Sequence, residues 1–135
     1  MQNLLTPDAF IGRAVGIPWR RWRSDWQACD CFGLIVLWFR EVLGVDLGDV
    51  PQTDIASGFA AVLGWVECGP EPGTTGFMTW RDGAPTHCGI VASRGQLLHA
   101  QEGHPVPEHG SVRITRLEVM ARTCPDLRFY RRAPC

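Results

Sequence analysis

The chain of 135 residues and 15.0 kDa predicts a single domain over residues 1–135. Its composition, 45% hydrophobic and 20% charged, excludes a disordered chain, a collagen-like chain and a coiled coil. Thirteen basic and fourteen acidic residues leave a formal net charge of -1, which offers no basic field to attract nucleic acid. The apolar run 32–39 is too short to cross a bilayer, and residues 1–8 lack the pattern of a secretory signal peptide. We therefore expect no membrane insertion and no leader.

Helices are predicted first along the chain. Residues 31–43 contain no proline and are apolar nearly all round, which indicates a buried helix. Asp30 is a suitable N-cap for it, and Gly44 is a typical residue just beyond a helix end. A second, weaker helix is predicted over residues 54–65.

Beyond residue 76 the pattern changes to that of strands. Residues 93–95 form a short hairpin loop, with Gly95 where the left-handed conformation is wanted. A helical part followed by antiparallel strands is typical of the α+β class. The predicted strands cover residues 77–80, 86–92, 96–100, 112–115 and 127–131.

Cys31 is the candidate nucleophile because it lies in the first turn of the predicted buried helix. A helix N-terminus lowers the pKa of a thiol through its dipole and its free N–H groups. The same N–H groups are suited to bind a developing oxyanion. Gly33 keeps the local surface small, so we expect a substrate backbone to approach closely there.

Two histidines supply the base that such a thiol needs. If Ala92 pairs with Gln96 across the hairpin, Gly89 lies opposite His99, and His87 lies diagonal to His99 on the same face. A Cys31–His87–His99 relay follows if this face packs against the helix N-terminus. His87 is then the general base, and His99 orients it.

Other readings of these residues remain open. A cysteine in an apolar helix is often a small buried hydrophobe, and a strand histidine is often structural. The six cysteines form no pair of C-x-x-C motifs, so we expect mostly reduced thiols, with Cys29 half-buried in a loop. A zinc site is the alternative use of these residues, although the C-x-C spacing fits it poorly. Its ligands would be Cys29, Cys31, His87 and His99.

Three motifs resemble those of the NlpC/P60 cysteine peptidases. Residues 30–35, Asp-Cys-Phe-Gly-Leu-Ile, are similar to the family's D-C-x-G-L-[VI] signature. Residues 86–91 resemble its H-V-G-I-Y strand, and residues 97–100 its (F/L)-x-H-A strand. Residues 16–19 resemble its G-x-P-Y approach to the nucleophile helix. The motifs occur in family order, and the resemblance spans about residues 10–132.

The resemblance implies a papain-like α+β fold with the nucleophile at the N-terminus of a buried helix packed on a small antiparallel sheet. It implies Cys31 as nucleophile, His87 as general base and His99 as the orienting residue, with no metal or organic cofactor. The implied reaction is hydrolysis of amide bonds in bacterial cell-wall stem peptides, typically beside a D-γ-glutamyl residue. We expect Asp30, Trp19 and Gly33 to contact the substrate.

Two features resemble the phage-tail branch of the family. The chain is a bare catalytic domain, and residues 101–103 and 129–132 are similar to tail-tip peptidases of siphophages and gene-transfer particles. This implies a location at a virion tail tip, with tail-hub proteins as partners. One alternative is a structural tail-tip protein that docks through the Trp/Arg stretch at 18–26. Another is an amidase or acyltransferase on the same fold.

The sequence departs from the family pattern at three places. Trp19 replaces a tyrosine, and residues 20–23 replace a Gly-rich stretch. Cys88 replaces the valine of the H-V-G-I strand, a change we expect to be modest because alternation points it away from His87.

Overall fold

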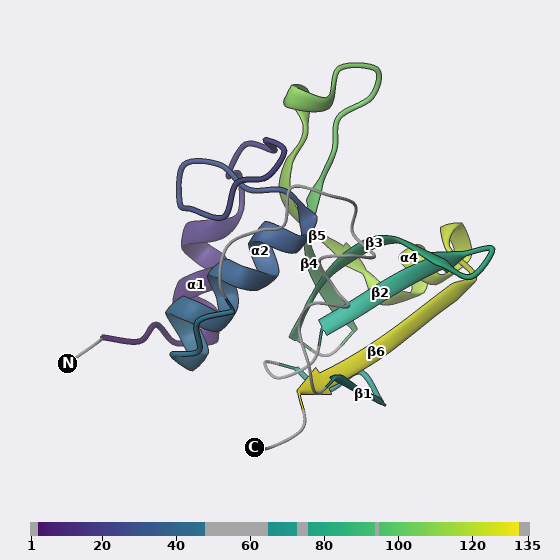
Figure 1. Cartoon of the computed structure of the whole chain (residues 1–135), viewed down its shortest axis with the longest axis horizontal. Helices are drawn as coiled ribbons and strands as arrows, with labels where there is room; N and C mark the ends of the chain where they lie inside the picture. The colour runs from purple at the N-terminus through teal and green to yellow at the C-terminus, as the bar shows by residue number, and fades with distance from the viewer. Residues whose placement is uncertain (1–2, 48–64, 73–75, 94, 133–135) are drawn as a thin grey trace.

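The computed structural model describes residues 3–47, 65–72, 76–93 and 95–132. These residues fold into helices packed on a six-stranded antiparallel sheet of order β1-β6-β2-β3-β4-β5, so the predicted α+β class is confirmed (Figure 1). No helix among them is long and apolar enough to span a membrane. The elements are α1 (Pro7–Ala14), α2 (Cys31–Trp38), a π-helical turn (Phe39–Leu43), β1 (Trp65–Cys68), β2 (Gly76–Arg81), β3 (Ala84–Ser93), β4 (Gln96–Gln101), a 3-10 turn (Pro107–His109), β5 (Ser111–Arg116), α4 (Leu117–Thr123) and β6 (Asp126–Arg132).

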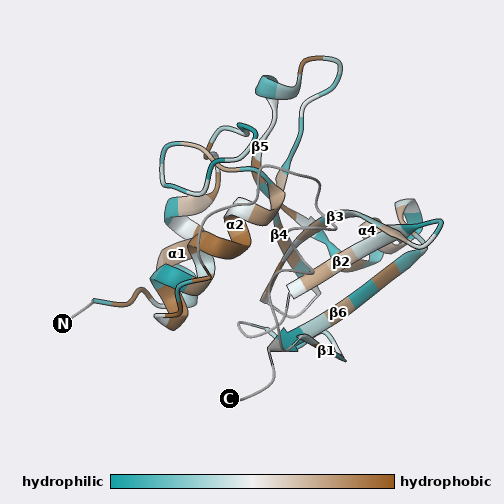
Figure 2. Ribbon diagram, in the orientation of Figure 1, coloured by the Kyte–Doolittle hydropathy of each residue, from teal (hydrophilic) through white to brown (hydrophobic). Residues whose placement is uncertain are grey.

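The α2 helix is the buried helix that the sequence predicts. The Asp30 side chain caps it by accepting a 2.7 Å hydrogen bond from the Gly33 N–H. Every residue of α2 is buried, which explains why its apolar residues occur on all sides (Figure 2). The predicted end is also confirmed, because Gly44 adopts the left-handed conformation with φ of 69°.

The five predicted strands are confirmed, each extended by a few residues. In the hairpin of β3 and β4, Ile90 pairs with Leu98 and Val91 with Leu97, as the predicted register requires. The predicted pair of Ala92 with Gln96 is wrong, because the register shifts there and Ser93 takes that place. An extra residue at such a bulge bends the strand without changing the register farther in.

Two helices, one strand and the 3-10 turn were not predicted. The start of α1 carries a recognisable signal, since the Thr6 side chain accepts a 3.1 Å hydrogen bond from the Ala9 N–H and a proline follows. β1 and the seven-residue α4 are short and carry little periodicity. Residues 54–64 of the second predicted helix lie outside the described residues, and its last residue, Trp65, instead begins β1.

Two hydrophobic clusters lie on opposite faces of the sheet. The larger cluster joins α1 and α2 to inward side chains such as Ile90 and Leu98, and α2 packs on β3 and β4. The smaller cluster joins Phe77, Val91 and Leu97 to Met120 of α4. α2 therefore packs on the strands that carry the two candidate histidines, but on the face opposite their side chains, which share the face of Phe77. The expectation that the histidine face packs against the helix is wrong.

Candidate active site

Cys31 is the first residue of α2, and only 7% of its surface is exposed. Hydrogen bonding from the Cys88 thiol lowers the pKa of Cys31 well below its usual value, and hydrogen bonding and charge from His87 lower it further. Burial acts in the opposite direction but is outweighed. The structure therefore favours a thiolate at Cys31, as the position at a helix N-terminus predicts.

Cys88 has the largest effect on the pKa of Cys31, which its position in the sequence does not suggest. Alternation points its side chain to the face opposite His87, into the core, where it is 0% exposed. There it meets the thiol of Cys31. Burial and then the contact with Cys31 raise the pKa of Cys88, so it keeps its proton and donates it in a hydrogen bond. The expected alternation is confirmed, and the side chain that it turns away from His87 lies where it lowers the pKa of Cys31.

The two histidines meet on one face, as the register arithmetic predicts. His87 Nε2 lies 2.9 Å from His99 Nδ1, and the rings are nearly perpendicular at 83°. The Phe77 ring packs edge-on against both imidazoles. This packing depends on Gly89, where a Cβ would clash with the Phe77 ring.

His99 is neutral in this environment. It is 2% exposed, and burial, followed by the charges of His87 and Arg113, lowers its pKa to about 3. His87 is half-buried and uses Nε2 for His99, which leaves Nδ1 for Cys31. The structure thus brings together a half-buried imidazole and a buried neutral imidazole that contacts its Nε2.

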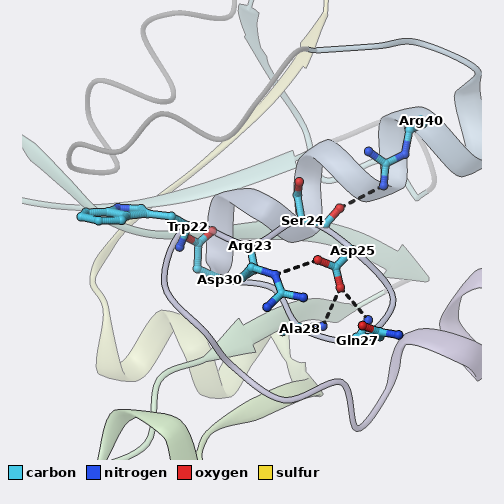
Figure 3. A network of polar contacts seen from close by, with 8 residues as sticks. All are labelled: Trp22, Arg23, Ser24, Asp25, Gln27, Ala28, Asp30 and Arg40. Carbon is cyan, nitrogen blue, oxygen red and sulfur yellow. Dashed lines mark hydrogen bonds and ion pairs between the residues drawn. The ribbon is translucent and has the colours of Figure 1, made fainter.

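A loop over residues 20–28 closes on the first turn of α2 (Figure 3). The Asp30 N–H donates to the Arg23 carbonyl over 3.1 Å, and the Trp22 N–H donates to Asp30 Oδ2 over 2.6 Å. Arg40 binds the Ser24 carbonyl over 2.9 Å and ties the far side of the loop to the π-helical turn. The carboxylate that caps the nucleophile helix therefore also anchors the loop.

Comparison with known proteins identifies the family of the chain. The family model described as NlpC/P60 family matches residues 18–118, which include Cys31, His87 and His99. The chain belongs to the NlpC/P60 family. The comparison with curated proteins yields no match.

Solved NlpC/P60 structures show the same fold. The NlpC/P60 domain of the peptidoglycan hydrolase SagA matches with a TM-score of 0.59 and 20% identity, covering 96% of this chain and 100% of that chain. An NlpC/P60 family protein from Bacillus cereus ATCC 10987 matches with a TM-score of 0.67 and 16% identity. That match covers 96% of this chain but only 40% of the Bacillus protein. At these identities the likeness concerns the fold.

The three residues expected to bind substrate, Gly33, Trp19 and Asp30, all contact other parts of this chain. The expectation that Gly33 leaves open space for a substrate is wrong, because the Arg23 carbonyl fills that space and a Cβ would overlap it. Trp19 is 7% exposed and packs in the larger core cluster. Both Asp30 oxygens accept backbone N–H groups, and burial raises the pKa of this carboxyl to about 6. Substrate contact by Asp30 stays a prediction.

The other cysteines near the NlpC/P60 motif are thiols. Cys29 is fully buried, not half-buried as predicted, because its chain segment bridges Trp19 and Ser24. Burial raises its pKa to about 12, which keeps it protonated. Within the described ranges, no group of three or more His, Cys, Asp or Glu side chains is placed to hold a metal ion.

A second loop, residues 102–110, lies beside the loop at 20–28 (Figure 1). The Trp19 N–H donates to the Gly110 carbonyl over 3.0 Å, and Arg20 donates to the Glu108 carbonyl over 3.0 Å. His104 and His109 are exposed in this loop. The two loops therefore support each other at the end of the molecule where α2 begins.

Proposed function

We propose that this NlpC/P60 chain is a cysteine endopeptidase that hydrolyses amide bonds in peptidoglycan stem peptides. The observation that carries the proposal is the histidine pair, in which His87 Nε2 lies 2.9 Å from His99 Nδ1. It accompanies Cys31, whose pKa is lowered by Cys88 and by His87. The choice of substrate is supported by the family and by the fold shared with the NlpC/P60 domain of a peptidoglycan hydrolase.

Acylation begins with attack of the Cys31 thiolate on the stem-peptide carbonyl carbon. The Gly33 N–H is already bound to Asp30, and the Leu34 N–H to the Asp30 carbonyl. We therefore assign the oxyanion to the first-turn amides of Cys31 and Phe32, for which a helix supplies no carbonyl partner. The C–N bond then breaks, and His87 gives its Nδ1 proton to the departing amine.

Deacylation uses the same residues in reverse. Neutral His87 takes a proton from a water molecule at Nδ1, and the hydroxide attacks the thioester carbon. The C–S bond breaks, which releases the new carboxylic acid and restores the Cys31 thiolate beside a protonated His87. His99 stays neutral throughout, because its burial disfavours a second positive charge next to His87.

The finer features of the proposal rest on the resemblance of the sequence motifs. We place the cleaved bond beside D-γ-glutamate. We place the protein at the tail tip of a phage or phage-like particle, where hub proteins are its partners. The support for the tail tip is the likeness of residues 101–103 and 129–132 to tail-tip peptidases.

Digestion of purified Gram-negative peptidoglycan tests the proposal. Wild type and Cys31→Ala are compared, with Cys124→Ala as a matched control because Cys124 packs in the other cluster, under α4. Mass spectrometry of the muropeptides is expected to show new stem-peptide fragments with free carboxylate and amine ends for wild type and Cys124→Ala alone. An intact wall with all three proteins would refute the proposal. A new acyl linkage in place of the free ends would indicate an acyltransferase instead.

A further inference from the structure

Thr115 of β5 extends the histidine pair by one more group. Its Oγ1 lies 2.7 Å from His99 Nε2, the ring nitrogen that His87 does not use. The sheet register produces this contact, since Thr115 pairs with Leu97 and so lies diagonal to His99 on the same face. The side chains of Cys31, His87, His99 and Thr115 thus form one continuous polar chain across α2, β3, β4 and β5.

The charged state of the site fixes the direction of every hydrogen bond in this chain. When Cys31 is a thiolate and His87 carries both ring protons, His87 Nε2–H donates to His99 Nδ1. His99 is neutral, so its single proton lies on Nε2 and points at Thr115. Thr115 Oγ1 accepts this proton, whichever way its own hydroxyl hydrogen turns.

The opposite tautomer would disable the base. A proton on His99 Nδ1 would point at His87 Nε2 and force that nitrogen to act as an acceptor. A neutral His87 in that form carries its proton on Nδ1, facing Cys31, and has no free lone pair there for the thiol proton. The tautomer of His99 therefore decides whether His87 acts as a base toward Cys31.

We propose that Thr115 is a positioning residue that holds His99 as its Nε2–H tautomer and thereby keeps His87 ready to take and return protons at Cys31. The inference rests on the proposed function for its catalytic consequence. The claim about the tautomer rests on the two ring contacts of His99, with His87 and with Thr115, together with its burial. Thr115 Oγ1 contacts His99 Nε2, so its effect on His87 and Cys31 passes through His99.

Among the described residues that interact with His99, no other group is placed to accept its Nε2–H in place of the Thr115 hydroxyl. The groups that act on His99 are His87 and Arg113, and both oppose a positive charge on it. The Phe77 ring covers it from β2. Without the hydroxyl, the Nε2–H of an imidazole that is 2% exposed loses its partner, and the other tautomer gains in population.

Alkylation of Cys31 by iodoacetamide, followed across pH, tests the inference without any wall substrate. The charged and titratable groups at Cys31 are His87, Cys88, Asp30 and Cys29, and they are the same in every variant. Thr115→Val removes the acceptor at nearly constant shape, and Thr115→Ser keeps it. Ile114→Val is the matched control, because Ile114 is the exposed neighbour of Thr115 on the same strand.

We expect Thr115→Val to shift the alkylation profile to higher pH and to slow alkylation at neutral pH by about tenfold, the scale of one unsatisfied buried group. Thr115→Ser and Ile114→Val should follow the wild-type profile. On a stem-peptide substrate, Thr115→Val should lower kcat with little change in KM. An unshifted profile for Thr115→Val, or an equal shift for Thr115→Ser, would overturn the inference.

The tautomer is also observable in the unmodified protein. Long-range proton–nitrogen NMR correlations distinguish a protonated Nε2 from a protonated Nδ1, so the test does not depend on the folding of a variant. A proton on His99 Nε2 is expected, and a proton on Nδ1 would overturn the inference. If wild type leaves peptidoglycan intact but shows the Nε2–H tautomer and the shifted Thr115→Val profile, the proposed substrate fails and the role of Thr115 stands.

Discussion

Gly33→Ala tests how the nucleophile helix is held. A Cβ at Gly33 would overlap the Arg23 carbonyl oxygen and lie 2.9 Å from the carbonyl carbon. The obstacle is backbone, which cannot swing away as a flexible side chain does. The loop must therefore move, and the 3.1 Å hydrogen bond from the Asp30 N–H to Arg23 is lost. Overpacking costs about 1–3 kcal/mol and an unsatisfied buried amide about as much, so we expect a loss of about 2–6 kcal/mol.

Urea unfolding measures this loss directly. With a typical slope of about 2 kcal/mol per molar urea, the midpoint of Gly33→Ala should fall by roughly 1–3 M. Gly12→Ala is the matched control, since Gly12 lies in α1 and a Cβ there meets nothing within 4 Å. Replacing a helical glycine by alanine gains about 1 kcal/mol, so the midpoint of Gly12→Ala should rise by about half a molar. If Gly33→Ala unfolds at the wild-type midpoint, the close approach of the loop is refuted.

Two further predictions concern proton binding. His99 has a pKa of about 3 in the fold, so below pH 6.5 the unfolded chain takes up a proton that the folded chain refuses. The free energy of unfolding should therefore decrease as the pH is lowered, by about 2 kcal/mol from pH 7 to pH 5. The decrease should be smaller in His99→Gln, with both proteins measured by urea unfolding. Asp30, whose pKa is raised to about 6, acts in the opposite direction in both proteins and largely cancels in the difference. Cys88→Val removes a donor to the Cys31 thiolate, so the iodoacetamide profile should move to higher pH; an unchanged profile would show that the thiol contact does not matter.

The fold around the nucleophile was predictable because its determinants are local. Asp30 as N-cap, the apolar run after it and Gly44 at its end are signals within a short stretch of chain. The contact of His87 with His99 was also predictable, since hairpin register is fixed by a short loop and by strand alternation. The bulge at the loop does not disturb this contact, because the predicted register resumes with the pair of Val91 and Leu97.

The unpredicted features depend on contacts between segments that are distant in the chain. Nothing near Gly33 in the sequence shows that the Arg23 carbonyl lies on it, since the loop conformation decides this. The contact of Cys88 with Cys31 requires α2 to be placed on β3, and strand alternation alone gives only the direction of the side chain. Thr115 requires the pairing of β4 with β5, whose connection is a long loop that fixes no register.

The central claim is that Cys31 carries the acyl group during cleavage, and trapping that group tests it most directly. A synthetic stem peptide with the γ-D-glutamyl linkage is mixed with the protein, quenched in acid within the first turnover, and the protein is digested for mass spectrometry. The account predicts the acyl half of the peptide on the fragment that contains Cys31, released by hydroxylamine as expected for a thioester. An acyl group on another residue, or cleavage that continues in Cys31→Ala, would contradict it.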